Sequence, residues 1–158
     1  MACDDDPSPP PAAPDGGADT PCGRGPAQVS LGVGQPYQPN PDQVFQTERG
    51  LQGGVHVDVS LRVQGSLDPD SVDVQIRLWD GDTLRGRHDT ADWFFFIDEA
   101  AVACDYPKAR LVLEDGADGA LPPDRVAEVT DRPLTLEVRL SSPAGQAEHR
   151  AQVTLRAP

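Results

Sequence analysis

The cysteines are the residues of this sequence most able to direct its chemistry. Cys3 follows Ala2, and together they match the last two positions of the motif at which bacterial lipoproteins are cleaved and acylated. The sequence starts too close to Cys3 to include the apolar stretch and the basic flank that accompany this motif. We expect Cys3 to carry a lipid. The alternative is an incidental thiol in a disordered tail.

Two further cysteines remain once Cys3 is set aside. Cys22 and Cys104 then form an even pair, which predicts a disulfide in an oxidising compartment and two free thiols in a reducing one. A loop of about 80 residues closed in this way stabilises the fold by roughly 4 kcal/mol through chain entropy. No cysteine and histidine spacing typical of a zinc site occurs in the sequence, and no cofactor is expected.

Carboxylates in turns are the candidate metal ligands. Calcium sites in extracellular β domains are built from loop carboxylates, but no acidic run here has the EF-hand spacing. Aspartate is also an ordinary turn residue, because its side chain bonds to the local backbone. We therefore expect no bound metal and keep five acidic residues as weak calcium candidates: Asp80, Asp82, Glu114, Asp115 and Asp118.

Neither the histidines nor the aromatic run carries a catalytic signature. His56, His88 and His149 lie outside any G-x-S-x-G or H-E-x-x-H motif, so we expect no enzymatic activity. The run Trp93–Phe96 is expected in a strand, where alternation places Trp93 and Phe95 on one face and the two remaining phenylalanines on the other. One pair would face the core, and the other would cover a sheet edge or form a contact surface.

The overall charge excludes two classes of partner. The chain has 26 acidic and 13 basic residues, a formal net charge of −13. Such a chain is repelled by nucleic acid and by anionic lipid head groups. No apolar run is long enough to span a membrane, so we expect membrane attachment only through a lipid on Cys3.

The elements that must position these residues are strands. Residues 1–26 contain seven prolines and four glycines and are expected to form a disordered Pro/Asp-rich tether. From 27 to 158 apolar and polar residues alternate with period two, which indicates antiparallel strands with one buried face. We predict an all-β domain, an immunoglobulin-like antiparallel β-sandwich of about seven to nine strands. A jelly roll is the main alternative, and a closed barrel is less favoured.

Two segments add a resemblance to a family. The segment Leu51–Val63 and the closing hairpin Leu134–Leu155 resemble those of uncharacterised bacterial envelope lipoproteins. In that family a cysteine and a Pro/Asp-rich tether precede one immunoglobulin-like domain. The resemblance covers roughly residues 25–158 and implies a fold and a location. It implies no catalytic or ligand-binding residue.

These observations lead to one expected function and one alternative. We expect a non-enzymatic module with an interaction or structural role, lipid-anchored in the bacterial cell envelope on its periplasmic or outer-surface side. Its possible partner is an envelope protein. The alternative is a secreted carbohydrate- or calcium-dependent binding domain.

Overall fold

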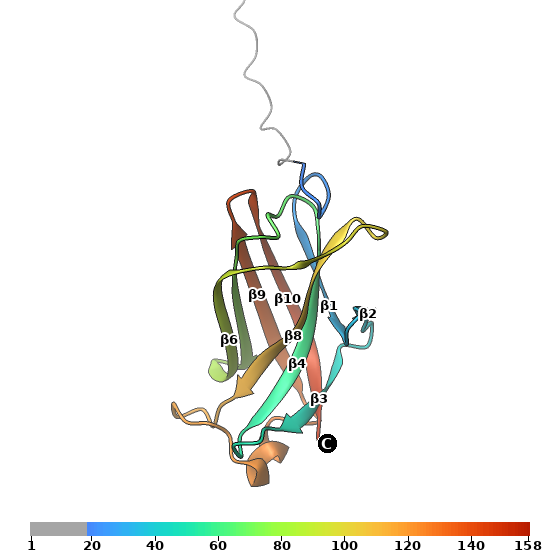
Figure 1. Ribbon diagram of the computed structural model, residues 1–158. Coiled ribbons are helices and arrows are strands. Elements are labelled where there is room, and N and C mark those ends of the chain that lie inside the picture. The colour runs from blue at the N-terminus through green and yellow to red at the C-terminus, as the bar shows by residue number, and fades with distance from the viewer. Residues whose placement is uncertain (1–18) are drawn as a thin grey trace, which may run out of the picture.

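The computed structural model describes residues 19–158, so the expected lipidation site at Cys3 lies outside the described residues. These residues form strands and one 3₁₀ helix, η1, arranged as Figure 1 shows. The elements are β1 Gln28–Val33, β2 Gln38–Pro39, β3 Val44–Arg49, β4 Val55–Gln64, β5 Val72–Asp80, β6 Thr83–Trp93, β7 Phe96–Asp98, β8 Ala103–Leu113, η1 Pro123–Glu128, β9 Pro133–Ser142 and β10 Gly145–Arg156.

The strands close into a barrel, so the prediction of an immunoglobulin-like sandwich is wrong. Seven strands follow one another around the barrel in the order β4, β3, β10, β9, β5, β6 and β8, and β8 pairs with β4 to complete the ring. The strands β1, β2 and β7 are additions to this ring. The sheet is also not purely antiparallel, because β3 and β10 run parallel.

Strand β4 makes the closure possible. One edge of β4 pairs with β1 through Ser60–Gln64 and with β3 through Val55–Val57. Its other edge pairs with β8 along most of its length. A sheet that closes on itself leaves no exposed edge at this strand. Alternation could not reveal this pairing, because sandwiches and barrels both bury one face of each strand.

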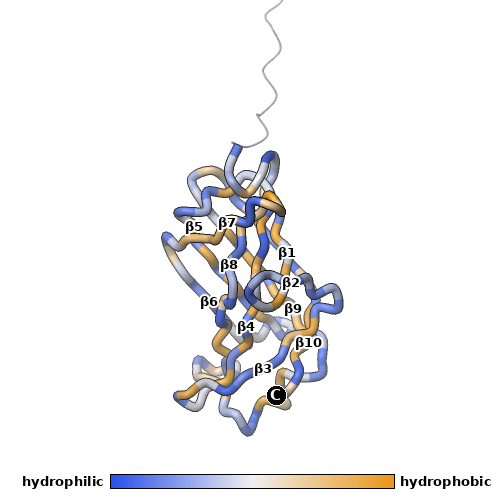
Figure 2. Tube along the Cα trace, turned by 45° about the vertical axis from the view of Figure 1, so that its right-hand side comes forward, coloured by the Kyte–Doolittle hydropathy of each residue, from blue (hydrophilic) through white to orange (hydrophobic). Residues whose placement is uncertain are grey.

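The alternating apolar residues fill the interior of the barrel. Along β4, β5 and β9 every second residue is buried, from Val55, Val72 and Leu134 onward. These side chains belong to one continuous hydrophobic cluster. Figure 2 shows the same pattern as short hydrophobic stretches that alternate with hydrophilic ones along the strands. All-β architecture and period-two burial are therefore confirmed.

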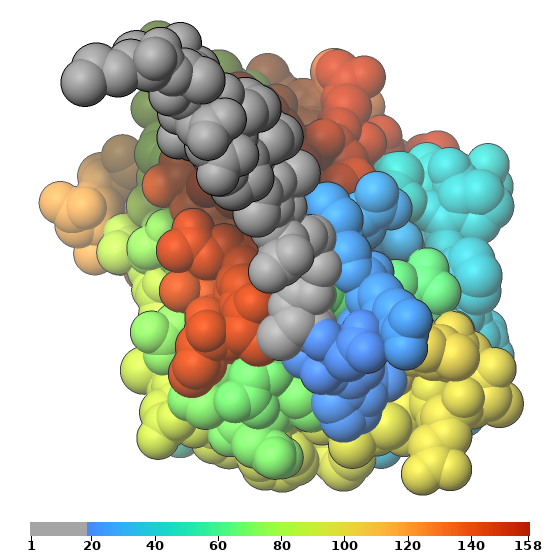
Figure 3. Space-filling view, turned by 90° about the horizontal axis from the view of Figure 1, so that it is seen from above, coloured from blue at the N-terminus to red at the C-terminus, as the bar shows by residue number. Residues whose placement is uncertain are grey.

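A disulfide fastens the start of the described chain to the barrel. Cys22 is bonded to Cys104 at the beginning of β8, with 5.0 Å between their Cα atoms, so the expected disulfide is present. Both cysteines are completely buried. The backbone N–H of Gly65 donates to the carbonyl of Cys22, and that of Ser66 donates to Gly25. Viewed from above in Figure 3, the blue start of the described chain lies beside the yellow segment that precedes β8.

No helix among residues 19–158 is long and apolar enough to cross a membrane.

Candidate functional site

Three aromatic rings lie exposed where β6 passes into β7. Trp93, Phe94 and Phe96 are 42%, 47% and 51% exposed. The rings of Trp93 and Phe94 stack with centroids 5.4 Å apart, and Phe96 meets Phe94 edge-on at the same distance. We call these three residues the aromatic patch. Large exposed apolar groups that contact one another are typical of interaction surfaces on proteins.

The patch forms because the strand breaks inside the aromatic run. Asp92 has a φ of 50°, and Phe94 and Phe95 belong to no strand. The backbone N–H of Phe95 donates to the carbonyl of Pro69 at 2.7 Å, and its ring is buried against Tyr106. The expectation that Trp93 and Phe95 share a face is therefore wrong. Only Phe95 faces the core.

A groove of about 500 Å³ begins at Phe96 and runs along the outside of the barrel. The segment that joins β1 to β2 forms its other wall. We call it the outer groove. Its lining mixes apolar and acidic residues: Gly34, Gln35, Pro36, Tyr37, Ser60, Phe96, Ile97, Asp98, Glu99, Asp105 and Pro107.

The wall formed by residues 34–37 is held by hydrogen bonds to the barrel. Ser60 of β4 donates its Oγ–H to the carbonyl of Gly34 at 2.8 Å. Tyr37 donates its hydroxyl to the carbonyl of Leu31 at 3.1 Å. A Cβ atom on Gly32 would overlap the Tyr37 ring, so only glycine lets the tyrosine pack here.

Arg62 organises the charges beside the groove. Its guanidinium donates to Asp105 on β8 and to Asp98 on β7, with N–O distances of 2.7 Å. It also lies 4.6 Å from the centroid of the Tyr37 ring, within range of a cation–π interaction. One side chain thus connects β4, β7, β8 and the β1–β2 segment.

The pKa shifts of Arg62 and Asp98 favour their charged forms near neutral pH. The hydrogen bond to Asp105 is the main cause that raises the pKa of Arg62. The pKa of Asp98 lies below its ordinary value, chiefly because Asp98 accepts the backbone N–H of Ala101 and secondly because it pairs with Arg62. Burial raises the pKa of Tyr37, which therefore stays neutral. With Glu99 also lining it, the groove presents more negative than positive charge.

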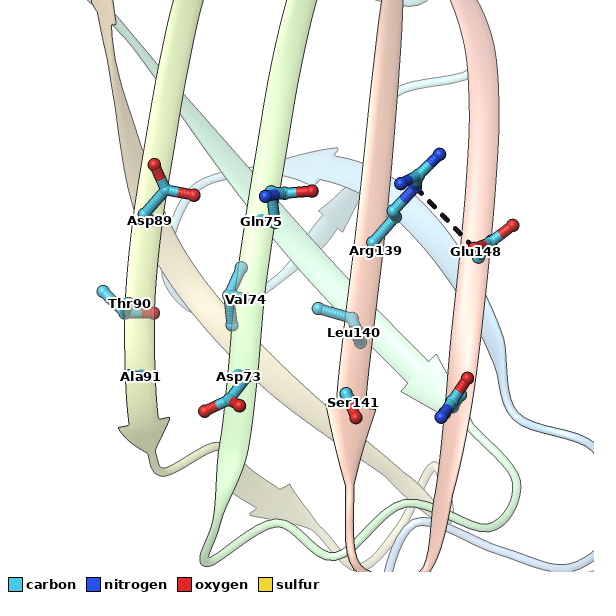
Figure 4. A pocket seen from close by; sticks show the side chains of 11 residues that line it. Asp73, Val74, Gln75, Asp89, Thr90, Ala91, Arg139, Leu140, Ser141 and Glu148 are labelled. Carbon is cyan, nitrogen blue, oxygen red and sulfur yellow. Dashed lines mark ion pairs between the residues drawn. The ribbon is translucent and has the colours of Figure 1, made fainter.

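A larger hollow, of about 600 Å³, lies across β6, β5, β9 and β10 (Figure 4). In Figure 4 Asp89, Gln75, Arg139 and Glu148 form a polar row across these four strands. Arg139 and Glu148 are 3.7 Å apart and mostly exposed, and Asp89 pairs with Arg77. Exposed, mutually paired charges of this kind are typical of a solvated sheet face. We therefore prefer the outer groove as the candidate site.

The weak calcium candidates do not gather around one point. Asp80 lies 3.3 Å from Arg132, and Glu114 makes two hydrogen bonds with Arg87. The side chain of Asp115 accepts the backbone N–H groups of Ala117 and Gly119. Asp82 and Asp118 are exposed on turns. Within residues 19–158 none of the five belongs to a group of three possible ligands.

One such group does exist elsewhere, at residues that the sequence did not mark as metal ligands. Glu48, His56 and Asp58 place their ligand atoms within 4.8 Å of one another. The spacing of His56 and Asp58, two residues apart in one strand, was a visible signal that both face the same way. The partner Glu48 depends on the pairing of β3 with β4, which the sequence does not reveal.

The chain matches no protein-family model, no curated protein and no solved structure.

Proposed function

We propose that this chain is a non-enzymatic interaction module of the bacterial cell envelope that binds a protein partner through the aromatic patch and the outer groove. The observation that carries the proposal is the aromatic patch itself: three contacting rings, each about half exposed, of which Phe96 also lines a groove with fixed charges. Aromatic side chains are the commonest centres of binding energy in protein interfaces.

The chemistry of the groove indicates what the partner presents. Tyr37, Phe96 and Ile97 offer apolar contacts, and Glu99 has no ion-pair partner among residues 19–158. Asp98 and Asp105 share a single arginine. A segment with an apolar side chain followed by a lysine or arginine is complementary to this surface in shape and charge.

The ring geometry favours a protein over a carbohydrate. Sugar binding needs a flat aromatic face open to the ligand, whereas Trp93 and Phe94 each cover one face of the other, and the rings of Phe94 and Phe96 meet at an angle of 81°. The face of Tyr37 is occupied by Arg62.

The proposed location rests on separate support. The Cys22–Cys104 disulfide is typical of proteins that fold in an oxidising compartment. The Ala2-Cys3 pair supports lipid attachment. Growth with an alkyne fatty acid tests this: we expect label on the wild-type chain and none on Cys3→Ser. Equal labelling of the two would overturn it.

A peptide library tests the binding role. A phage-displayed library of random linear peptides is selected on the full chain and, in parallel, on the variant Phe96→Ser. We expect the wild type to enrich peptides that pair an apolar residue with a basic one, and the variant to lose them. Leu51→Ser is the matched control, because Leu51 is fully exposed outside the patch and the groove.

The same variants separate the alternatives. Enriched peptides are titrated into ¹⁵N-labelled protein, and shifts confined to residues 93–99 and 34–37 support the proposal. A panel of soluble oligosaccharides is titrated in the same way. Shifts with sugars and none with peptides would overturn the protein partner in favour of carbohydrate. Peptides that bind Phe96→Ser as well as the wild type would overturn the site.

A further inference from the structure

The second cluster lies on the outside of β3 and β4, away from the outer groove. Glu48 on β3 stands directly opposite His56 on β4, and Asp58 follows two residues later on the same face. Nε2 of His56 lies 3.5 Å from Oε2 of Glu48 and 4.0 Å from Oδ1 of Asp58. His56 precedes Arg62 by six residues in an extended strand, so the two sites are about 20 Å apart.

His56 is a buried side chain with an unused nitrogen. Its side chain is 8% exposed, and Nε2 is covered and has no hydrogen-bond partner among residues 19–158. Buried polar atoms are nearly always paired, because leaving one unpaired costs free energy. Neither carboxylate satisfies Nε2, since each lies too far away or in poor alignment. The buried nitrogen therefore lies unpaired within 4.0 Å of two carboxylates.

We infer that Glu48, His56 and Asp58 form a binding site for one divalent transition-metal cation, with Zn²⁺ as the best match. Zinc is bound by imidazole nitrogen and carboxylate oxygen at about 2.0–2.2 Å, which places neighbouring ligand atoms in a tetrahedral site roughly 3.3 Å apart. Nε2 lies 3.5 and 4.0 Å from the two carboxylates, and all three ligand atoms lie within 4.8 Å of one another, so the carboxylates would move inward to bind one ion. Calcium prefers oxygen ligands alone, so the imidazole disfavours it.

The surroundings allow a cation to enter and to be held. A hollow of about 500 Å³ lined by His56, Gly50, Leu51 and Arg110 adjoins the cluster. The two carboxylates give the cluster a negative charge that attracts a cation. Arg110 is the cation facing it, with Nε 3.3 Å from Oδ1 of Asp58, and its side chain is 59% exposed. It can turn outward when a metal binds.

Three protein ligands leave one position of a tetrahedral zinc ion for water. The site is therefore open on its solvent side, where Glu48 is also mostly exposed. This inference does not depend on the proposed function, because the metal ligands and the aromatic patch share no residue.

Titration with metal alone tests the site. ZnCl₂ is titrated calorimetrically into the full chain treated with chelator, with Cys3→Ser in every sample so that the third cysteine contributes no ligand. We expect one zinc ion per chain with a Kd of about 1 μM or tighter. Glu48→Gln and Asp58→Asn should each weaken binding roughly 10-fold or more, because each removes a charged ligand. Glu148→Gln, an exposed acid at another place, is the matched control and should bind like the wild type.

A second readout identifies the histidine without relying on a variant that could fail to fold. The ¹⁵N resonance of His56 Nε2 should shift on zinc addition, whereas those of His88 and His149 should stay unchanged. A tetrahedral Co²⁺ complex should give visible absorption that Asp58→Asn reduces. Absence of one-to-one binding, equal affinity in all variants, or a shift at another histidine would each overturn the site.

Discussion

Arg62 and Asp105 face each other across the β4–β8 pairing and share two hydrogen bonds, Nε to Oδ1 at 2.7 Å and Nη2 to Oδ2 at 2.8 Å. The two residues sit on the strands whose pairing closes the barrel. Their two parallel hydrogen bonds therefore stabilise the β4–β8 pairing on the outside of the barrel. The same guanidinium reaches Asp98, which couples this pairing to the outer groove.

Replacing Arg62 by lysine should destabilise the protein although the charge is kept. Lysine cannot form the paired hydrogen bonds or lie flat over Tyr37, and we expect a loss of about 1–2 kcal/mol. Urea unfolding followed by circular dichroism measures it. Arg150→Lys is the control, because Arg150 pairs with Glu137 on the surface, and it should change stability by less than about 0.5 kcal/mol. Equal effects of the two variants would contradict the role of Arg62.

His88 should make stability depend on pH. Burial lowers the pKa of His88 below its ordinary value of 6.5. Its Nδ1 donates to the carbonyl of Arg110, and its Nε2 then accepts from the hydroxyl of Tyr106. The unfolded chain binds a proton more readily, so this contribution to stability is complete above the unfolded pKa and is lost as pH falls through 6.5 toward the folded value.

The His88 prediction is checked in two measurements. An NMR titration should give His88 a midpoint below 6.5. The free energy of unfolding, measured from about pH 7.5 to about pH 5, should fall more steeply for the wild type than for His88→Gln, which has no titrating ring. Parallel curves for the two proteins would show that His88 does not contribute.

Removing the disulfide should cost the fold a large part of its stability. Cys22 and Cys104 are 82 residues apart, and cross-linking a loop of this length stabilises by about 4 kcal/mol through chain entropy. We expect the double variant Cys22→Ala/Cys104→Ala to show this loss in urea unfolding, with Cys3→Ser in both proteins to prevent thiol exchange. A change below about 1 kcal/mol would indicate that the unfolded chain is already compact.

Gly65 and Gly53 form a matched pair for testing backbone strain. Both have a positive φ, of 113° and 85°. A Cβ on Gly65 would overlap the backbone of Pro26, whereas a Cβ on Gly53 would meet nothing within 4 Å. We expect Gly65→Ala to lose about 3 kcal/mol and Gly53→Ala about 1 kcal/mol, measured by thermal and urea unfolding. Similar losses would show that conformation alone, and not contact with Pro26, decides the cost.

The sequence predicted local burial better than it predicted the pairing of strands. Alternation along Val55–Val63 and Leu134–Leu140 is strict, and both segments are strands with that buried face. Strand β6 carries no such signal, because most of its residues from Thr83 to Trp93 are polar and do not alternate with apolar ones. Its place in the ring depends on pairing with β5 and β8. A period-two pattern shows which face of a strand is buried but does not show which two strands pair.

The candidate site was foreseen only in part. The run Trp93–Phe96 suggested a contact surface, and three of its four rings are exposed. The strand is interrupted at Phe95, so the side chains do not alternate between faces there. The backbone N–H of Phe95 donates a hydrogen bond to the carbonyl of Pro69, and its ring is buried in the core. The opposite wall, near Tyr37, could not be predicted, because it lies in a segment without periodic pattern. Contacts between distant segments decide both features.

The disulfide determines how the domain carries mechanical load. A pull on Asp19 reaches Cys22 and passes through the covalent bond to Cys104 at the beginning of β8, so β1 cannot be peeled from the barrel first. Strand β8 is held on the ring by both β4 and β6. The residues between the two cysteines form a closed covalent loop that cannot extend under tension between the ends of the described chain. Force therefore falls on the segment after Cys104, and the Gly32–Tyr37 packing and the outer groove wall lie inside the shielded loop.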